Sequence, residues 1–401
     1  MKAYACFNAG SSSIKFAVFV ERDGALVSSS RGEVDNGSAE PRLRARGPVG
    51  PGVERALDGE RGYGAQMGAV IAWIEEHLAP ARLSGVGHRV VHGGNAHAGP
   101  ALVTPALLEE LAALAPLAPL HQPNNLAAIR AMAALYPGLP QVACFDTAFH
   151  LGGPRVPRLY ALPRELAAQG IMRYGFHGLS YRHVAESLPA LEPRAGGRVV
   201  AAHLGSGASM CAMLGGHSVA TTMGFSALDG LPMATRCGRI DAGLLLYLLR
   251  EQRMTPEALE HLLYREAGLL GLSGISGDMR TLLASSAPAA REAVEVFVYR
   301  IGRELGSLAA AIGGLDVLVF TGGIGEHAAE IRARACTQAA WLGVRLDPAA
   351  NAAGGPRLHA PDSAVAVWVL PADEEAVIAR QTRSLVQAAS DGARMPPPEH
   401  A

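Results

Sequence analysis

The first residues that suggest chemistry form the segment NAGSSSIK, from Asn8 to Lys15. It joins residues 3–7 and 14–20, which are rich in β-branched and aromatic residues and are predicted to be strands. Small residues leave backbone N–H groups accessible to an anion, and a lysine ammonium is a compact point charge. Only two of the 35 basic residues are lysines. The segment is therefore either a polar hairpin turn or a place that holds a phosphate.

Two more turns of small residues follow predicted strands. HLGSG, at 203–207, comes after the apolar stretch 198–203, and TGGIGE, at 321–326, comes after the stretch 316–320. Three such turns in one chain indicate a nucleotide site, because each offers unobstructed backbone N–H groups. The pattern GxxxxGK[ST] is absent, which disfavours a P-loop fold.

A dinucleotide-binding interpretation also has support in the sequence. Gly323, Gly325 and Ala328 fit GxGxxA between a predicted strand and a helix, and Asp347 follows about twenty residues later. A Rossmann domain normally continues with further βα repeats, for which little chain remains. An NAD-dependent oxidoreductase is therefore the weaker alternative, and a non-catalytic nucleotide-binding scaffold is a third.

Polar side chains cluster in four further segments, where Arg, His or Asp stand at strand ends or beside glycines. An arginine near tight backbone, as at Arg89 and Arg236, suits bidentate capture of a carboxylate or phosphate. His88 and His92 have an i, i+4 spacing that zinc sites use, but they lie on a strand-like segment without an HExxH pattern, which disfavours zinc. The four segments are HRVVHGG (88–94), FDTAFH (145–150), YGFHGLSY (174–181) and DGLPMATRCGRID (229–241).

The elements that position these segments repeat along the chain. A strand, a turn of small residues and a returning strand occur at the start of both halves, and 401 residues exceed the size of most single domains. The pattern predicts two similar α/β domains on either side of a hinged cleft, residues 1–148 and 149–375, with a last helix from about 376 returning to the first domain. Residues 28–64 show little periodicity and are predicted to be loop and edge strand.

Composition excludes several classes of protein. The net charge of -1 gives no bulk attraction to nucleic acid or to an anionic membrane. The N-terminus has no signal-peptide pattern and no apolar run reaches about 18 residues, so a cytoplasmic protein is expected. The five cysteines are scattered and never in a CxxC pair, which favours reduced thiols.

Taken together, the motifs resemble those of the acetate kinases across nearly the whole chain. The resemblance implies an α/β fold of two duplicated actin-like (ribonuclease H-like) domains with an interdomain active-site cleft, and a homodimer. It also implies reversible phosphoryl transfer from ATP to acetate, giving acetyl phosphate and ADP, with Mg²⁺, or Mn²⁺ in its place. The matching motifs are NAGSSSIKF, HRVVHGG, FDTAFH, YGFHGLSY, HLGSGASM, DGLPMATRCGRID, GLSGISGDMR, FTGGIGEH and PADEEAVIA.

The same resemblance assigns roles to individual residues. The metal ligands would be Asn8 and Glu374. The catalytic residues would be Asp146, His177, Arg236 and Arg89. The acyl substrate would contact Arg89, Val91, Leu120, Phe176 and Ala227. The nucleotide and its phosphates would contact Ser11, Ser13, Lys15, His203, Leu204, Gly205, Ser206, Gly207, Asp278, Met279, Arg280, Gly323, Ile324, Gly325, Glu326 and His327.

The chemistry of a carboxylate kinase agrees with this set. Acetate is ionised at neutral pH and is its own nucleophile, so no general base is needed. Two anions must instead meet in line, which calls for cations and hydrogen-bond donors around the transferring phosphoryl group. We expect direct transfer, in which Asp146 orients an arginine or a metal-bound water and is not itself phosphorylated.

Some positions depart from the family pattern. Ser206 stands in place of an asparagine, Tyr181 in place of a frequent histidine, and Asp373 in place of an asparagine. Ala227 stands where proline is common, which enlarges the expected acyl pocket. Burying one more methylene is worth about 0.8 kcal/mol, so a propionate kinase or a broader short-chain acyl kinase is the alternative, with acetate preferred.

Overall fold

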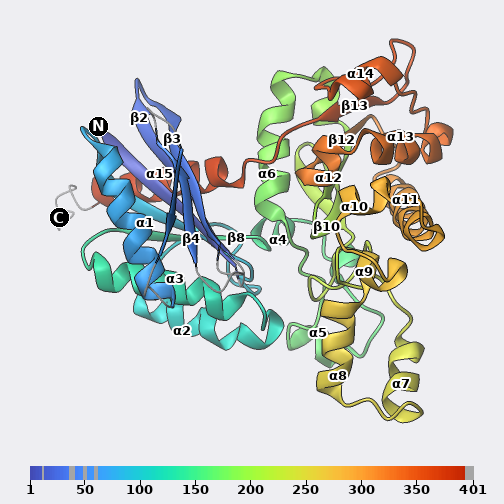
Figure 1. Cartoon of the computed structure of the whole chain (residues 1–401), viewed down its shortest axis with the longest axis horizontal. Coiled ribbons are helices and arrows are strands. Elements are labelled where there is room, and N and C mark those ends of the chain that lie inside the picture. Colours follow the sequence, from blue (N-terminus) through green and yellow to red (C-terminus); the bar gives the residue numbers. More distant parts are fainter. Residues whose placement is uncertain (11–12, 36–40, 48–51, 58–61, 393–401) are drawn as a thin grey trace, which may run out of the picture. The chain divides into compact units, whose positions relative to one another are not determined.

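A computed structural model describes residues 1–10, 13–35, 41–47, 52–57 and 62–392 of the chain (Figure 1). The chain divides into two compact units. Unit 1 consists of Met1–Ala148 and Asp373–Ala401, and unit 2 of Phe149–Ala372. Unit 1 is thus built from two separate stretches of sequence.

Unit 1 is organised around one mixed sheet with the strand order β5-β4-β3-β2-β1-β6-β8-β7. Each of β1 to β5 runs antiparallel to the next in this series, whereas β6 lies parallel to β1, β8 lies parallel to β6, and β7 lies antiparallel to β8. The bounds are β1 (Lys2–Ala9), β2 (Ser13–Arg22), β3 (Ala25–Asp35), β4 (Arg42–Arg46), β5 (Val53–Ala56), β6 (Arg82–Val90), β7 (Ala101–Leu102) and β8 (Gln141–Phe145).

Helices pack against this sheet because its strands bury side chains on both faces. On one face, Phe7, Phe16 and Val34 pack in a core with Trp73 of α1. On the other face α15 approaches so closely that a Cβ on Gly87 would lie 2.3 Å from a methyl of Ile378. The helices of unit 1 are α1 (Tyr63–Leu78), α2 (Pro105–Ala113), α3 (Gln122–Leu135), α4 (Ala148–Leu151, which continues into unit 2) and α15 (Glu374–Gly392), with the 3₁₀ turn Ala115–Leu117.

Unit 2 has a five-stranded sheet with the order β11-β10-β9-β12-β13. Strands β9, β10 and β11 are antiparallel, and β12 lies parallel to both β9 and β13. Strands β3, β2, β1, β6 and β8 of unit 1 have the same order and directions, so both units contain one five-stranded pattern. The bounds are β9 (Arg198–Leu204), β10 (Ala208–Leu214), β11 (His217–Thr221), β12 (Val317–Thr321) and β13 (Ala366–Val369).

Ten further α-helices, one π-helix and four 3₁₀ turns of unit 2 flank this sheet or extend from it (Figure 1). The 3₁₀ turns are Val156–Arg158, Leu188–Ala190, Pro193–Gly196 and Ala340–Leu342. Among all described helices, none combines the length and apolarity needed to cross a membrane. The α-helices are α5 (Arg164–Ala168), α6 (Gly178–Ser187), α7 (Ala242–Arg250), α8 (Pro256–His261), α9 (Gly268–Ser273), α10 (Met279–Ala284), α11 (Pro288–Ala311), α12 (Gly322–His327), α13 (Ala329–Gln338) and α14 (Pro348–Ala353), and Leu262–Glu266 is a π-helix.

Two local predictions need correction. Residues 28–64 were predicted to be loop and edge strand. Their described parts include the edge strand β5, but they also hold β4 and most of β3, which lie inside the sheet. In β4 the arginines are exposed while Leu43 and Ala45 are buried, a two-residue alternation that a strand requires. The segment TGGIGE, predicted to be a turn before a helix, itself forms the short helix α12.

Candidate functional site

In unit 1, three predicted site residues lie at the carboxyl ends of adjacent parallel strands. Asn8 is at the end of β1, Arg89 is near the end of β6, and Asp146 directly follows β8. Parallel neighbours bring such residues to one edge of the sheet, which is where α/β proteins commonly bind ligands. Glu374 is the first residue of α15, which packs on the same strands. The sheet therefore gathers four residues that are far apart in the sequence.

The Arg89 guanidinium is the centre of this group. Its Nε lies 3.1 Å from both oxygens of Asp146, and its Nη2 lies 2.5 Å from Asp146 Oδ2, which is a bidentate contact. Its Nη1 donates to Asn8 Oδ1 at 3.1 Å. Glu374 Oε2 is 3.7 Å from Arg89 Nε. One cation thus holds the oxygens of three side chains.

Burial shapes the charges of this group. Burial disfavours the charged guanidinium, but Asp146 and Glu374 outweigh it and raise the pKa of Arg89. Burial raises the pKa of Glu374 to about 7, and Arg89 and Lys15 act in the opposite direction. Asp146 is only 1% exposed. Two carboxylates face one arginine, so the group is negative when Glu374 is ionised.

The oxygens around Arg89 suit a hard divalent cation. Mg²⁺ prefers carboxylate and carbonyl oxygens and usually keeps several of its waters, so one or two side-chain ligands are enough. Asn8 Oδ1 and Glu374 Oε2 are such oxygens, and both face Arg89. Among the described residues, no three His, Cys, Asp or Glu side chains form a metal-binding group. The donor set therefore fits a water-rich Mg²⁺ site.

The first hairpin supplies a nearby cation. Lys15 on β2 pairs in register with Asn8 on β1, and its charge acts on Glu374. Gly10 donates its backbone N–H to the Ser13 carbonyl at 2.8 Å, which closes the turn between the strands. Ser11, another predicted phosphate contact, lies outside the described residues.

The predicted acyl contacts fall in both units. In unit 1, Val91 is buried and donates its N–H to Asn125 Oδ1 at 3.0 Å, and Leu120 is half-buried. In unit 2, Phe176 is buried, and the carbonyl oxygen of Ala227 accepts from Arg236. Each pair is thus held by hydrogen bonds or by burial within its own unit.

In unit 2, the predicted catalytic side chains meet at a glycine. A Cβ on Gly207 would lie 3.3 Å from His177 Nε2 and 3.7 Å from Arg236 Nη2. A Cβ on Gly205 would lie 3.9 Å from His203 Nε2 and 4.0 Å from the backbone N of Gly323. The Cβ position at Gly207 is thus bordered by a ring nitrogen and a guanidinium, whereas the one at Gly205 also lies 3.3 Å from the Gly207 carbonyl oxygen. The groups on the Gly207 side suit an anion.

His177 occupies a strained backbone position. It precedes α6 with φ 58° and ψ 25°, the left-handed region that residues other than glycine rarely adopt. Its Nδ1 is 2.8 Å from Ser209 Oγ, and its ring stacks on His203 with centroids 4.3 Å apart. His203 Nδ1 is in turn 2.8 Å from Ser180 Oγ. Hydroxyls of two neighbouring elements thus orient both rings.

The backbone around Arg236 is tightly packed. Its Nη1 donates to the Ala227 carbonyl at 2.9 Å. Gly268, with φ 64°, lies against this loop so closely that a Cβ would be 2.2 Å from the Met233 carbonyl oxygen. Gly277 contacts the same loop at Ala234, which places the segment that contains Asp278 beside it.

The other predicted nucleotide segments have structural partners. Asp278 caps α10 and pairs with the exposed Arg280, and Met279 is buried. Arg332, 1% exposed, donates to the carbonyls of Gly325 and Glu326 at the end of α12. Glu326 Oε1 accepts from the N–H of Ala372 at 3.0 Å. The buried Arg332 side chain thus holds the Gly323–His327 segment in place through two backbone carbonyls. Of the remaining predicted contacts, Leu204 is the last residue of β9, Ser206 lies between β9 and β10, and Ile324 lies in α12.

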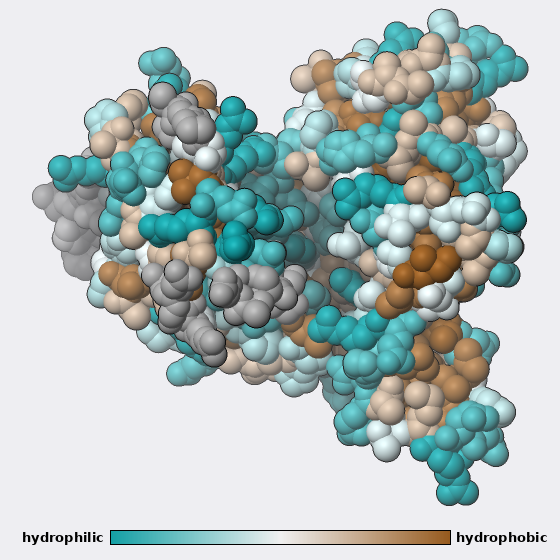
Figure 2. Space-filling model, in the orientation of Figure 1, coloured by the Kyte–Doolittle hydropathy of each residue, from teal (hydrophilic) through white to brown (hydrophobic). Residues whose placement is uncertain are grey.

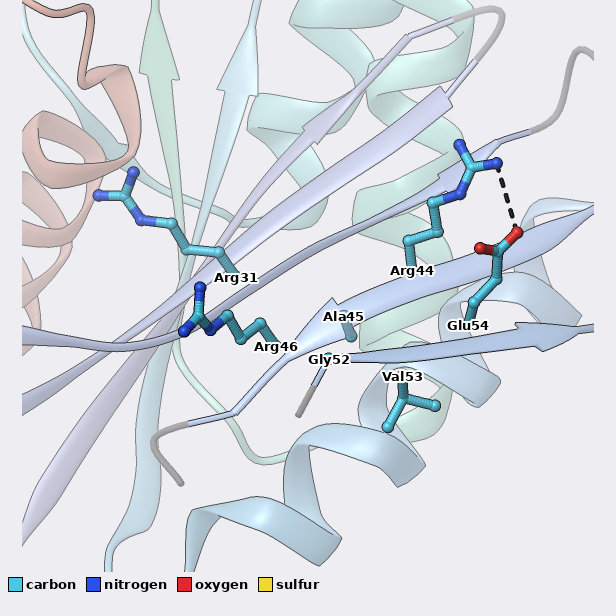
Figure 3. A pocket seen from close by; sticks show the side chains of 7 residues that line it. All are labelled: Arg31, Arg44, Ala45, Arg46, Gly52, Val53 and Glu54. Carbon is cyan, nitrogen blue, oxygen red and sulfur yellow. Dashed lines mark hydrogen bonds and ion pairs between the residues drawn. The ribbon is translucent and has the colours of Figure 1, made fainter. Parts of the chain in front are cut away.

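A separate basic depression lies on strands β3, β4 and β5 of unit 1 (Figure 3). It encloses about 370 Å³ and is lined mainly by Arg31, Arg44, Arg46 and Glu54. Arg44 pairs with Glu54 at 3.3 Å, and both side chains are about half exposed. The exposed ion pair makes this a solvated charged face, and it contains none of the predicted site residues.

Sequence reasoning missed several residues that hold the site. Asn125 donates to the Ala9 carbonyl at 2.7 Å and accepts from Val91, so it joins the end of β1 to the segment after β6. Ser209 and Ser180 hold the two stacked histidines. Ser209 was visible as a hydroxyl after the HLGSG turn, but its partner could not be read from spacing.

Comparisons with known proteins agree with one another. The model of the acetokinase family matches residues 4–380. A protein described as acetate kinase from Rhodopseudomonas palustris is 55% identical over 404 residues, covering 96% of this chain and 98% of the relative. Another, from Nitrobacter hamburgensis, is 51% identical and covers 94% of this chain and 95% of the relative.

Solved structures match over the same length. A propionate kinase from Francisella tularensis has a TM-score of 0.89 at 33% identity, covering 96% of this chain and all of that chain. An acetate kinase from Porphyromonas gingivalis has a TM-score of 0.85 at 32% identity, with the same coverage. These matches and the two mixed sheets confirm the predicted α/β fold class.

Proposed function

The chain belongs to the acetokinase family, and on this premise we propose that it transfers a phosphoryl group reversibly from ATP to acetate, giving acetyl phosphate and ADP. The observation that carries the proposal is the convergence of His177 Nε2 and Arg236 Nη2 on the space at Gly207. Such donors suit a phosphoryl group whose charge spreads over its oxygens during transfer.

Each unit supplies a different set of proposed contacts. In unit 1, Asn8 and Glu374 would hold Mg²⁺, while Ser11, Ser13 and Lys15 contact phosphate. When bound, the ion neutralises charge on the nucleotide phosphates. In unit 2, the turns 203–207 and 323–327, with residues 278–280, would contact the nucleotide. His177 and Arg236 would donate to the transferring phosphoryl group.

The transfer is direct. A carboxylate oxygen of acetate forms the new bond to phosphorus while the bond from phosphorus to the ADP oxygen breaks, and no proton changes place. Arg89 would bind the anionic acceptor. Val91 and Leu120 in unit 1, and Phe176 and Ala227 in unit 2, are the proposed contacts of the acyl group. The bidentate contact of Asp146 with Arg89 supports an orienting role for this carboxylate.

The central test is trapping of the product. Purified protein is incubated with ATP, Mg²⁺, hydroxylamine and acetate, propionate or butyrate in parallel, and acyl hydroxamate is measured. We expect acetyl hydroxamate that requires ATP and the metal ion. The absence of hydroxamate with every acid would contradict the proposal, and nicotinamide-dependent turnover would revive the oxidoreductase alternative.

The alternative is a preference for propionate. Its support is the similarity to the propionate kinase of Francisella tularensis and the alanine at position 227. Acetate remains the proposed substrate because the relatives of highest identity given above are described as acetate kinases. A higher kcat/KM for propionate in the same assay would reverse this choice.

The orienting role of Asp146 has its own test. After incubation with ATP alone, the mass of the intact protein should not change. We expect Asp146→Asn to lower kcat without abolishing ATP binding, because the amide no longer balances the Arg89 charge. Recovery of an acid-labile phosphate on Asp146 would rule out direct transfer.

We also propose that the chain forms a homodimer. Helix α7 buries none of its residues within the chain, and Leu244 and Tyr247, one turn apart, are 44% and 50% exposed. Brown apolar side chains gather on the visible face of unit 2 around α7 and α9 (Figure 2). A second copy would cover such a patch. Sedimentation equilibrium should give twice the 41.7 kDa chain mass, and Tyr247→Glu should lower it to one chain.

A cytoplasmic location is part of the same proposal, because ATP is the phosphoryl donor. The five cysteines all fall in the described residues, and no disulfide joins them. Reduced, mostly buried thiols are typical of that compartment. Recovery of the protein from an exported fraction would contradict the proposal.

A further inference from the structure

Two buried hydroxyl groups, those of Tyr181 and Ser209, are linked by hydrogen bonds to the His177 ring. Ser209 Oγ lies 2.8 Å from His177 Nδ1, and the Tyr181 hydroxyl is hydrogen-bonded to the same Ser209 Oγ. Tyr181 and Ser209 are both 0% exposed. Tyr181 lies on α6, Ser209 on β10, and His177 directly before α6. Their side chains form a short hydrogen-bond chain inside unit 2.

Packing decides which way the protons in this chain point. Tyr181 lies in the apolar core of unit 2, next to the rings of Phe149 and His150. Burial raises the pKa of the Tyr181 phenol well above its usual range, so the phenol keeps its proton. A buried hydroxyl proton needs an acceptor, and Ser209 Oγ is the acceptor that its hydrogen bond offers.

The direction of the Tyr181–Ser209 hydrogen bond then sets the direction of the Ser209–His177 hydrogen bond. A serine hydroxyl carries one proton and accepts through its lone pairs. Among the described residues, Ser209 Oγ has hydrogen bonds only to Tyr181 and to His177 Nδ1. If Tyr181 donates to Ser209, Nδ1 is therefore the acceptor that remains for the Ser209 proton. The reverse order would have Nδ1–H donate to Ser209 and Ser209 donate to Tyr181. It would leave the Tyr181 proton unsatisfied in a dry core, at the full cost of desolvation.

We propose that Tyr181 and Ser209 are positioning residues that hold the His177 ring as the tautomer protonated on Nε2. The inference rests on the proposed function, because it gives His177 a defined donor. Nε2 is the nitrogen on the Gly207 side, 3.3 Å from the position of a Cβ there, and Arg236 Nη2 is 3.7 Å from the same point. A neutral N–H and a guanidinium are thereby directed together at one anion.

Two further features of the ring are consistent with this role. The left-handed backbone at His177 and the stacked His203 ring restrict where the imidazole can lie. Neither contact selects a tautomer, because a stacked ring and a backbone angle do not distinguish Nδ1 from Nε2. The hydroxyl chain is the feature that can.

The test reads the tautomer directly. In protein labelled with ¹⁵N-histidine, the ring signals of His177 are assigned by their loss in His177→Gln. We expect Nδ1 unprotonated and Nε2 protonated in the unmodified protein, and a mixture of tautomers in Tyr181→Phe and Ser209→Ala. We expect kcat for acetyl phosphate formation to fall about tenfold in both variants, with the KM values for ATP and acetate unchanged.

Matched variants separate positioning from simple damage. Tyr4→Phe removes a phenol that is equally buried in unit 1 but has no hydrogen-bond partner among the described residues, so kcat and the His177 signals should stay the same. Ser209→Thr keeps a hydroxyl and should restore the Nε2–H signal that Ser209→Ala loses. This pair carries the test if Tyr181→Phe does not fold.

Two results would overturn the inference. One is Nδ1–H as the main tautomer in the unmodified protein, and the other is an unchanged tautomer in both Tyr181→Phe and Ser209→Ala. If the unmodified protein forms no acyl phosphate, the proposed function fails, while the ring signals still decide the tautomer. The failures of the two proposals are therefore distinguishable.

Discussion

The candidate sites of the two units hold their functional side chains by different means. In unit 1, Arg89, Asp146 and Glu374 hold one another through opposite charges, with Asp146 1% exposed. In unit 2, two neutral groups help to orient the side chains: Ser209 is hydrogen-bonded to His177, and a backbone carbonyl accepts from Arg236. A buried charge that loses its partner is costly, whereas a lost neutral hydrogen bond costs much less. Substitutions should therefore damage unit 1 through charge and unit 2 through geometry.

The largest effect is expected from Arg89→Met. Removing the guanidinium leaves Asp146 and Glu374 close together without their cation, which typically costs about 3–5 kcal/mol. We expect kcat/KM for acetate to fall at least about 10³-fold and the melting temperature to drop. Thermal unfolding and hydroxamate kinetics on the same preparation measure both. A loss of activity with an unchanged melting temperature would show that the charges of unit 1 do not stabilise its fold.

A smaller and purely geometric effect is expected in unit 2 from Gly207→Ala. The new methyl would sit 3.3 Å from His177 Nε2, in the space proposed for the phosphoryl group. We expect kcat/KM to fall about 10²-fold with little change in melting temperature, because the methyl displaces the His177 ring only slightly and exposes no charge. Gly196→Ala is the control, since a Cβ there meets nothing within 4 Å. Equal activity of the two variants would mean that the space at Gly207 is not used.

Part of this contrast between the two units could be predicted from the amino-acid sequence, and part of it depends on how the elements pack. Strand and turn patterns indicated two α/β domains, and they placed polar residues after apolar runs. In the structure, three of these residues, Asn8, Arg89 and Asp146, lie at one edge of a sheet. Resemblance then indicated which polar residues matter. Spacing could not predict that Tyr181 reaches Ser209, because that contact depends on how α6 packs against β10. Within 28–64 an edge strand was predicted, but not the two inner strands β3 and β4, since the exposed arginines masked a two-residue alternation.

Lowering the pH should destabilise both units to a similar extent. This prediction tests whether the difference between the two units is confined to their candidate sites. Burial lowers the pKa of His88 in unit 1 and of His150 in unit 2 to about 4, against 6.5 when unfolded. The unfolded chain therefore binds more protons between these values, so stability is full above pH 6.5 and falls as the pH drops toward 4. At pH 5.5 each histidine should cost about 1 kcal/mol.

The measurement compares single variants with the unmodified protein. Melting temperatures from pH 7.5 to pH 5 should fall less steeply in His150→Gln than in the unmodified protein, and His88→Gln should behave in the same way. A flat profile in the unmodified protein would mean that these rings are protonated in the folded state. A difference confined to one unit would extend the contrast beyond the sites.

The smallest effect is expected from an arginine of unit 1 that also pairs with an aspartate. Arg31 Nη2 lies 3.1 Å from Asp373 Oδ2, but the Arg31 side chain is 54% exposed, whereas that of Arg89 is 20% exposed. Exposed pairs contribute about 0–1 kcal/mol, because water already solvates both charges. Arg31→Ala should leave the melting temperature nearly unchanged and kcat close to normal, although Asp373 directly precedes Glu374. Comparable losses in Arg31→Ala and Arg89→Met would show that the number of charges, and not their burial, decides how unit 1 responds.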